Sequence, residues 1–388
     1  TLFIVTVYIM SCNKFPNKCT RGIGIMSKDQ PKFDLMPSHG FWSGRLNVAS
    51  VKNRTAKKLL GSTQSIEKKV IFYYQDQADL TPILFPETPV THVHVAAFHV
   101  YRPDGGDNEV MVHLNDDEPL LKDDSGQYVV PEKFQQLKTD IDEMHKVGIK
   151  VILMLGGAGG AYELLLDGGT DYSGGQSKLT SEEETALGSY FKNVVSSYGF
   201  DGIDFNIEDA STNCVWHSPN CQPDTTNVLV KLAKAMANGN NDFIVSITPL
   251  SILRNSRTIL WYNKLIKELN DDHIPLTYWN VQMYAGAADT QYFSEMNLGD
   301  VANMMTSLKL DNNQAVLGMC FSPDCGNIMK TKKGFEDALE AFTNFQVQFG
   351  GMFSWEYAYT APYQPGGGDD SLSLSPQLYW AFQVQSVL

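Results

Sequence analysis

The chain has 388 residues, of which 43% are apolar, and it carries a formal net charge of −14 at pH 7 with a sequence pI of about 5.0. This length and apolar content allow one large domain or two ordinary ones, with ample material for a core. The negative charge argues against a nucleic-acid partner, because a phosphate backbone would be repelled over most of the surface. A neutral ligand is more compatible with this negative charge than a nucleic acid is.

Residues 1–69 differ in charge from the rest of the chain. They hold 12 Lys or Arg against 3 Asp or Glu, which gives +9, whereas residues 70–388 carry −23. This asymmetry predicts a separate basic segment, which is an arm on the acidic domain, a leader or a solvated tail. The segment opens with the apolar run TLFIVTVYIM, which is too short to span a bilayer and resembles either the core of a secretion signal or a buried strand. No other run approaches transmembrane length, so we expect no membrane association.

The six cysteines fall into three close pairs: Cys12 with Cys19, Cys214 with Cys221, and Cys320 with Cys325. Each pair encloses a short loop that a disulfide could close, and an even count of this kind favours an oxidising compartment, so we expect a secreted protein. None of the pairs has CxxC spacing and no histidine cluster accompanies them, so we expect neither a metal site nor a cofactor. A monomer is the default expectation for the oligomeric state.

From residue 70 onward, short β-branched or apolar runs alternate with amphipathic stretches, as in parallel strands joined by helices. The predicted strands are VIFYY (70–74), VTHVHVAAFHV (90–100), KVILMLGG (150–157), GIDFNIE (202–208), FIVSITPL (243–250), YWNVQMY (278–284), AVLGMCF (315–321) and GGMFSWEY (350–357). Their near-continuous apolar character is typical of strands buried on both faces.

Helices are expected between these strands. Apolar residues recur at helical spacing from Phe134 to Val147 and from Leu187 to Val195, the second stretch behind a capping box at Ser181 and Glu184. Further helices are predicted near 225–237, 256–269, 333–347 and 376–386. Eight strand–helix units over residues 70–388 indicate a (β/α)8 barrel without a large α+β insertion. A doubly wound open sheet is the alternative, but no Gly-rich phosphate fingerprint supports it.

The stretch FDGIDFNIED, residues 200–209, has an unusual alternation within a strand. Asp204, Asn206 and Glu208 share one face, and apolar residues share the other. If the apolar face packs on the helices, the polar column points into the barrel and ends where the catalytic groups of such barrels lie. A buried polar column of this kind is costly unless its members bond one another or a ligand, so we expect a functional site.

Asp201 to Glu208 resemble the DGxDxDxE signature of family 18 glycoside hydrolases, which include chitinases, endo-β-N-acetylglucosaminidases and inactive relatives. Every position matches except Asn206. VIFYY, VAAFHV, KVILMLGG, NVQMY and GGMFSWEY resemble the first, second, third, sixth and eighth strands of the family, although Met154 stands where the third strand usually has Ser.

The resemblance implies a mechanism with one catalytic carboxyl group, in which the 2-acetamido group of the substrate acts as nucleophile. Glu208 would act as general acid and then as general base, Tyr284 would bond the acetamido carbonyl, and Trp355 would form the floor under the reacting sugar. Asp204 and Asn206 complete the catalytic column. Further candidates for sugar contacts are Tyr74, Phe98, Met283 and Gly157.

Asn206 replaces the aspartate that, in the family, holds the acetamido N–H and stabilises the oxazolinium intermediate by its charge. An amide keeps an acceptor oxygen but supplies no charge, and the loss of such a contribution costs about 10²–10³-fold in rate. Loss of a like charge beside Glu208 should also lower the pKa of that residue and the pH optimum. The chain is then a slow hydrolase, a glycan-binding protein without turnover, or a variant made to trap substrate.

The resemblance implies a neutral ligand, either a chitooligosaccharide or another glycan containing N-acetylglucosamine. The absence of an insertion before the eighth strand indicates an open groove suited to internal cleavage. We therefore expect an endochitinase, with an endo-β-N-acetylglucosaminidase and a silent lectin or inhibitor-like protein as alternatives.

Overall fold

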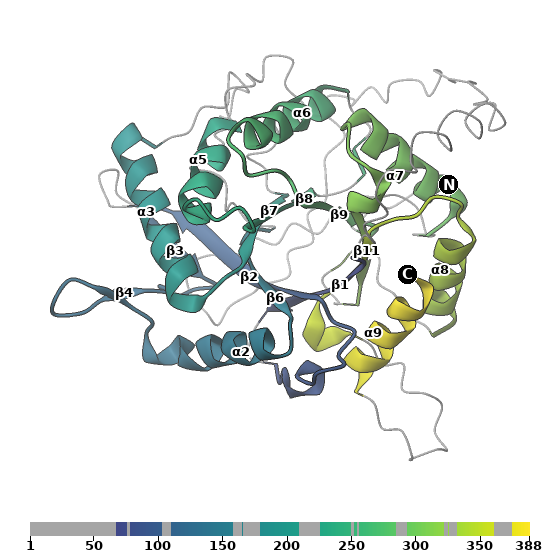
Figure 1. Ribbon diagram of the computed structural model, residues 1–388, viewed down its shortest axis with the longest axis horizontal. Helices are drawn as coiled ribbons and strands as arrows, with labels where there is room; N and C mark the ends of the chain where they lie inside the picture. Colours follow the sequence, from purple (N-terminus) through teal and green to yellow (C-terminus); the bar gives the residue numbers. More distant parts are fainter. Residues whose placement is uncertain are drawn as a thin grey trace, which may run out of the picture. The chain divides into compact units, whose positions relative to one another are not determined.

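Eight parallel strands close into a barrel in the computed structural model, which describes residues 67–75, 78–102, 110–157, 165, 179–208, 226–249, 252–253, 256–284, 293–321, 325, 332–360 and 375–388. The barrel strands are β1 (Lys69–Gln75), β2 (His92–Tyr101), β6 (Lys150–Gly156), β7 (Gly202–Ile207), β8 (Ile244–Pro249), β9 (Tyr278–Gln282), β10 (Ala315–Cys320) and β11 (Gly351–Trp355). They follow one another in chain order around the ring, and β1 pairs with both β11 and β2, which closes it (Figure 1). All eight strands and the (β/α)8 fold predicted from the sequence are confirmed.

Seven α-helices surround the strands in the described residues (Figure 1). They are α2 (Gln135–Lys146), α3 (Ser181–Tyr198), α5 (Thr226–Ala237), α6 (Ser256–Asp271), α7 (Glu295–Ser307), α8 (Lys332–Asn344) and α9 (Pro376–Val387). In the described part of the connection between β10 and β11 there is a single helix, α8, as expected for a barrel without an insertion domain. None of the helices within these described ranges has the length and apolar character that a bilayer span requires.

One expectation about the helices is wrong, and one connection has no helix in its described part. No helix was predicted between the first two strands, and residues 78–91 of the β1–β2 connection form only a 3-10 turn at Thr81–Ile83, because Pro82, Pro86 and Pro89 lack the N–H groups that a helix needs. The capping box of α3 lies one residue earlier than predicted. Thr180 accepts from the backbone N–H of Glu183, whose side chain accepts in return from the Thr180 N–H.

Three short strands and one helix were missed. β3 (Met111–Leu114) pairs antiparallel with the end of β2, and β4 (Leu121–Lys122) pairs with β5 (Tyr128–Val129) in a hairpin. Helix α7 follows the N-cap Ser294 and buries Leu298, Val301 and Met305 at helical spacing, so the sequence held a signal for it.

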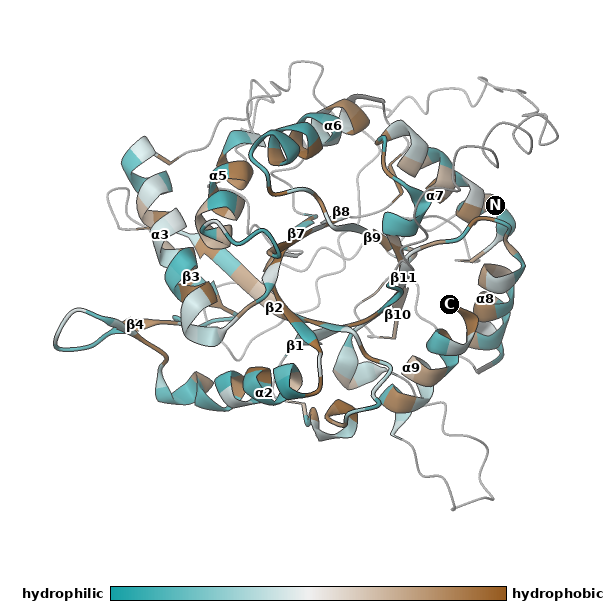
Figure 2. Cartoon of the chain, in the orientation of Figure 1, coloured by the Kyte–Doolittle hydropathy of each residue, from teal (hydrophilic) through white to brown (hydrophobic). Residues whose placement is uncertain are grey.

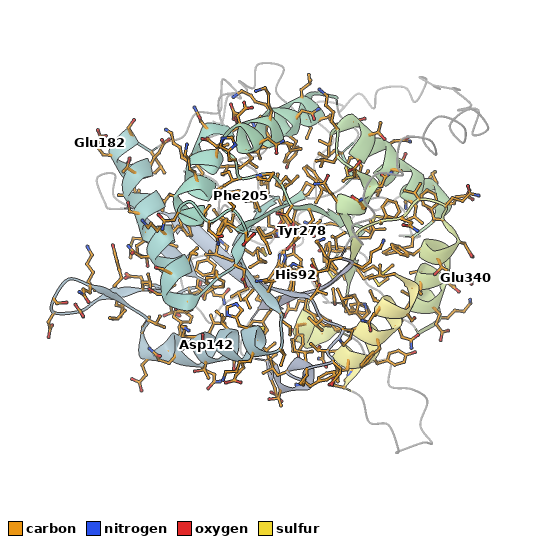
Figure 3. The ribbon with its side chains drawn as sticks, viewed as in Figure 1. His92, Asp142, Glu182, Phe205, Tyr278 and Glu340 are labelled. Atoms are coloured by element: carbon orange, nitrogen blue, oxygen red, sulfur yellow. A yellow bond between two sulfur atoms is a disulfide. The ribbon has the colours of Figure 1, made fainter. Side chains whose placement is uncertain are left out.

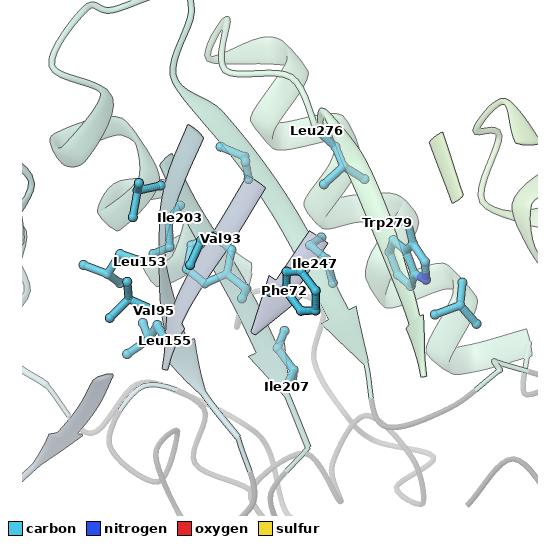
Figure 4. Packing of buried hydrophobic residues seen from close by; sticks show 14 of the residues in the cluster. Phe72, Val93, Val95, Leu153, Leu155, Ile203, Ile207, Ile247, Leu276 and Trp279 are labelled. Atoms are coloured by element: carbon cyan, nitrogen blue, oxygen red, sulfur yellow. The ribbon is translucent and has the colours of Figure 1, made fainter. Parts of the chain in front are cut away.

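Two apolar layers hold the barrel together. The larger lies between strands and helices, and Figure 4 shows part of it, with Phe72, Val93, Leu153 and Ile203 projecting from neighbouring strands. Helices turn their hydrophobic side toward this layer and their hydrophilic side outward (Figure 2). The smaller layer fills the barrel interior and includes Tyr73, Met154, Tyr278 and Phe353.

The predicted boundary between a basic segment and the barrel is not tested, because residues 1–66 lie outside the described residues. The chain divides between Gln64 and Ser65, and everything described belongs to the second unit.

Candidate active site

The interior of the barrel holds a buried carboxylate, Asp204, which is 0% exposed. Ser246 and Thr248 each donate a hydroxyl hydrogen bond to its Oδ1, at 2.6 and 2.9 Å, and the hydroxyl of Tyr73 donates to Oδ2 at 2.9 Å. The amide of Asn280 approaches Oδ1 at 3.4 Å. These donors replace the water that the carboxylate lost on burial.

His94 borders this carboxylate from β2. Its Nδ1 lies 3.5 Å from Asp204 Oδ2, which is an electrostatic contact rather than a well-formed hydrogen bond, and its Nε2 lies 2.9 Å from the Tyr278 hydroxyl. Burial by itself raises the pKa of Asp204, but the contact with His94 and the hydroxyl hydrogen bonds outweigh it and hold that pKa below its ordinary value. Asp204 is therefore a fixed negative charge at the base of the column. Figure 3 shows how deep this region lies, with His92 and Tyr278 inside the ring of strands.

Asn206 comes next in the column, 2% exposed, and the protein uses little of its hydrogen-bonding capacity. Its Nδ2 donates to the Met154 sulfur at 3.7 Å, and its Oδ1 accepts from the Gln282 amide at 3.5 Å. Both bonds are long, and a thioether is a weak acceptor. The chain differs from the family pattern at both Met154 and Asn206, and the two differences are compatible with each other. An aspartate at position 206 would receive no hydrogen bond from the Met154 sulfur, whereas the Asn206 amide can donate one to it.

Glu208 follows β7 at the carboxyl end of the barrel and is partly exposed. The Gln282 side chain donates a hydrogen bond to its Oε1 at 2.8 Å. Tyr284 is nearby, and burial, with the charges of Glu208 and Asp204, raises its pKa well above the ordinary value. Tyr284 thus stays a neutral phenol that can donate a hydrogen bond to a ligand.

Trp355 ends β11 at the same mouth of the barrel and is partly exposed. Its ring lies 5.4 Å from that of Tyr73, centroid to centroid, and it packs with the interior layer that also contains Tyr284. The predicted disulfide between Cys320 and Cys325 is present and belongs to this layer, with a Cα–Cα distance of 6.4 Å. The other two predicted cysteine pairs lie outside the described residues.

Tyr74 and Met283 do not lie with these groups, and the expectation that they contact a sugar there is not supported by their positions. Strand alternation places both in the layer under the helices. The hydroxyl of Tyr74 donates to the Ala78 carbonyl at 3.2 Å, and its ring lines a separate hollow of about 630 Å³ with Phe134. Met283 is 1% exposed.

Phe98 also faces the helices, where its ring lies 5.8 Å from that of Phe200. Simple alternation from His94 would have placed it in the interior, but the register of β2 against β6 shifts between Val95 and Phe98 and reverses the facing. Gly157, at the end of β6, is at the mouth, yet its N–H is already bonded to the Asn206 carbonyl at 2.9 Å.

Six polar residues of the interior that contact the column were missed from the sequence: Tyr73, His94, Ser246, Thr248, Asn280 and Gln282. A signal for three of them exists, because His92 and His94 alternate within VTHVHVAA, and Asn280 and Gln282 alternate within YWNVQMY. The same alternation of polar and apolar residues had placed Asp204, Asn206 and Glu208 on one face of their strand.

Comparison with known proteins identifies the family. The sequence model of glycosyl hydrolases family 18 matches residues 69–361, which include all eight barrel strands. The chain belongs to glycosyl hydrolase family 18. By family it is a glycoside hydrolase, and members of the family act on glycans that contain N-acetylglucosamine.

Solved structures of family 18 proteins share the fold at low sequence identity. A fungal endo-β-N-acetylglucosaminidase is 19% identical with a TM-score of 0.52, covering 82% of this chain and 98% of its own. A chitinase from the fern Peteris ryukyuensis is 14% identical with a TM-score of 0.52, covering 82% and 99%. A chitinase from Flavobacterium johnsoniae is 14% identical with a TM-score of 0.50, covering 83% and 94%. A search of curated protein sequences returned no match.

Proposed function

We propose that the protein is a slow endochitinase, which hydrolyses β-1,4-linked N-acetylglucosamine with retention and takes its nucleophile from the substrate. The observation that carries this proposal is the column itself. Glu208 stands at the barrel mouth, the next position of the column is the amide Asn206, and the remaining carboxylate, Asp204, is fully enclosed. Asp204 cannot reach a sugar carbon, so the column offers one working carboxyl group.

A retaining glycosidase with two enzyme carboxyl groups requires them about 5–5.5 Å apart, with one as nucleophile. In this column the second role falls to the 2-acetamido oxygen of the bound sugar. Glu208 protonates the glycosidic oxygen and later removes a proton from the incoming water. Tyr284 and Asn206 hold the acetamido group, and Trp355 supports the sugar ring. Once Glu208 has given up its proton, its carboxylate and the fixed charge of Asp204, deeper in the column, are the negative charges that the column offers the cationic intermediate, and Asn206 adds none at the position of the family aspartate.

The low rate follows from Asn206, whose amide orients the acetamido group without neutralising the developing positive charge. Two alternatives use the same residues at the barrel mouth: an endo-β-N-acetylglucosaminidase acting on N-glycans, and a lectin or inhibitor-like protein that binds without turnover. We favour chitin because nothing in the sequence indicates recognition of a branched mannose core. We also propose that the protein is secreted and monomeric.

The test compares release from a fluorogenic chitooligosaccharide and from a high-mannose glycopeptide, with sugar binding measured by calorimetry. Glu208→Gln should lower turnover by about 10²–10⁴-fold and leave binding intact. Glu340→Gln, an exposed carboxylate of α8, is the matched control and should change nothing. The proposal of hydrolysis would be contradicted if the unmodified protein, the Asn206→Asp variant and the Asn206→Asp, Met154→Ser double variant all bound sugar without turnover. Preferential cleavage of the glycopeptide would contradict the choice of chitin.

A further inference from the structure

The end of β2 carries a second cluster of polar side chains, away from the catalytic column. Here β2 pairs antiparallel with β3, with His99 opposite His113 and Tyr101 opposite Met111. The two faces of this hairpin differ sharply. One face is entirely buried and consists of Phe98, Val100, Val112 and Leu114, whereas the other is partly exposed and consists of His99, Tyr101, Met111 and His113.

Three of the four side chains of the partly exposed face contact one another. The Tyr101 hydroxyl is 2.5 Å from His113 Nε2 and 3.4 Å from the Met111 sulfur, and the Tyr101 and His113 rings are 4.3 Å apart between centroids. His99 is the direct cross-strand neighbour of His113. Side chains at such positions have Cβ atoms about 5 Å apart, so their imidazoles can converge on a single atom.

We propose that His99, His113, Tyr101 and Met111 form a copper site. Two imidazole nitrogens, a phenol oxygen and a thioether sulfur are the donor set, and a copper ion would bind His113 Nε2 and the Tyr101 oxygen as adjacent ligands, in place of the hydrogen bond that now joins them. Coordination by Tyr101 releases its phenolic proton to solvent. Imidazole ligands bind Cu²⁺ more tightly than Zn²⁺ or Ni²⁺, and thioether sulfur suits copper among these metals.

The charge around the hairpin favours a cation. Burial lowers the pKa of His113, and the negative charges of Asp116, Asp117 and Glu118, which directly follow β3, oppose that shift, although Asp117 is also ion-paired with Lys133. No group of three or more His, Cys, Asp or Glu side chains able to hold a metal occurs among the residues that the structure describes. A site here therefore depends on the phenol and the thioether, which is why we assign copper and not zinc.

The test is titration of the full chain with Cu²⁺ in a competing chelator, followed by electron paramagnetic resonance. We expect nitrogen coordination in the unmodified protein. His99→Ala and His113→Ala should each lower the affinity by about 100-fold or more, because loss of even a residue that only supports a metal ligand costs roughly 10–100-fold. His273→Asn, an exposed histidine at a turn, is the control and should bind copper as the unmodified protein does.

A second variant keeps the proposal testable if the hairpin tolerates alanine poorly. Tyr101→Phe preserves both imidazoles and the ring packing, and it should abolish the phenolate-to-copper charge-transfer absorption while nitrogen coordination remains. Circular dichroism confirms that each variant is folded. Folded His99→Ala and His113→Ala proteins that bind Cu²⁺ as tightly as His273→Asn would overturn the proposal, as would tighter binding of Zn²⁺ than of Cu²⁺.

Discussion

Gln282 donates a hydrogen bond to Glu208 across the barrel mouth, over 2.8 Å. Glu208 follows β7 and Gln282 ends β9, and β8 lies between these strands in the sheet. The bond therefore spans the interior and fixes the orientation of the carboxyl group. The same amide nitrogen lies 3.5 Å from Asn206 Oδ1, so one side chain positions both polar residues at the top of the column.

Replacing Gln282 by Leu should lower kcat/KM by about 10–100-fold, because a hydrogen bond to a charged group contributes about 1.5–3 kcal/mol. The loss should lie mainly in kcat, since the bond orients the acid. Gln346→Leu, at an exposed position after α8, is the matched control. Steady-state kinetics on a chitooligosaccharide would show the effect, and equal values for the two variants would refute this role.

Asn206 and Met154 should behave as a coupled pair. Asn206→Asp alone places a carboxylate at a site that is 2% exposed, in line with Asp204 and Glu208 and beside a sulfur that donates nothing. Burial and like charges then favour its neutral form, so we expect little gain in rate. Adding Met154→Ser supplies a hydroxyl donor, and the double variant should gain about 10²–10³-fold. A cycle of four proteins measures the coupling, and a full gain from Asn206→Asp alone would exclude it.

Asp204 should make stability depend on pH in the acid range. Its pKa in the folded protein lies below the ordinary value of 3.8, so the unfolded chain binds the proton more tightly. The stabilising contribution is present above that ordinary value and is lost as the pH falls through the folded pKa. Asp204→Asn should be less stable at pH 7 by about 1–3 kcal/mol or more, because buried donors lose their acceptor. The melting temperatures of the unmodified protein and of Asp204→Asn should therefore converge as the pH is lowered from neutral into the acid range. A difference in melting temperature that stays constant with pH would contradict this.

Tyr284→Phe should lower kcat by about 10²-fold, because it removes a donor aimed at the acetamido oxygen. The raised pKa of Tyr284 keeps the phenol neutral at ordinary pH, so the alkaline limb of the pH–rate profile should not move. Tyr262→Phe is the control, since the Tyr262 hydroxyl is buried without a hydrogen-bond partner among the described residues. Its removal should leave activity unchanged and keep or slightly raise the free energy of unfolding. A shifted alkaline limb in Tyr284→Phe would show that the phenol titrates there.

The disulfide between Cys320 and Cys325 should act on both stability and binding. Closing so short a loop stabilises by about 2 kcal/mol in the chain-entropy account. Because the pair packs in the same layer as Trp355, Cys320→Ser with Cys325→Ser should also raise KM for a chitooligosaccharide. Thermal unfolding and kinetics measure the two effects. A thiol count under non-reducing conditions tests the predicted compartment, and six free thiols would contradict it.

The sequence alone determined the barrel and the chemical identity of its column. The eight apolar runs are long and β-branched, and they alternate with amphipathic stretches, so their type and order follow from local physics. The period of two from Asp204 to Glu208 placed three polar groups on one face, and the structure confirms that this face is the interior. Asn206 was recognised as a departure because that position is fixed by the motif.

Only the tertiary structure decided which side chains meet that column. Tyr73, His94, Asn280 and Gln282 come from three other strands, and their partners depend on barrel register, which no local pattern specifies. The shift of register in β2 turned Phe98 outward, against simple alternation. The pairing of His99 with His113 depends on the register of β2 against β3, which only the folded structure fixes. Composition and periodicity fix which elements form, whereas distances across a closed sheet arise only when the strands are packed together.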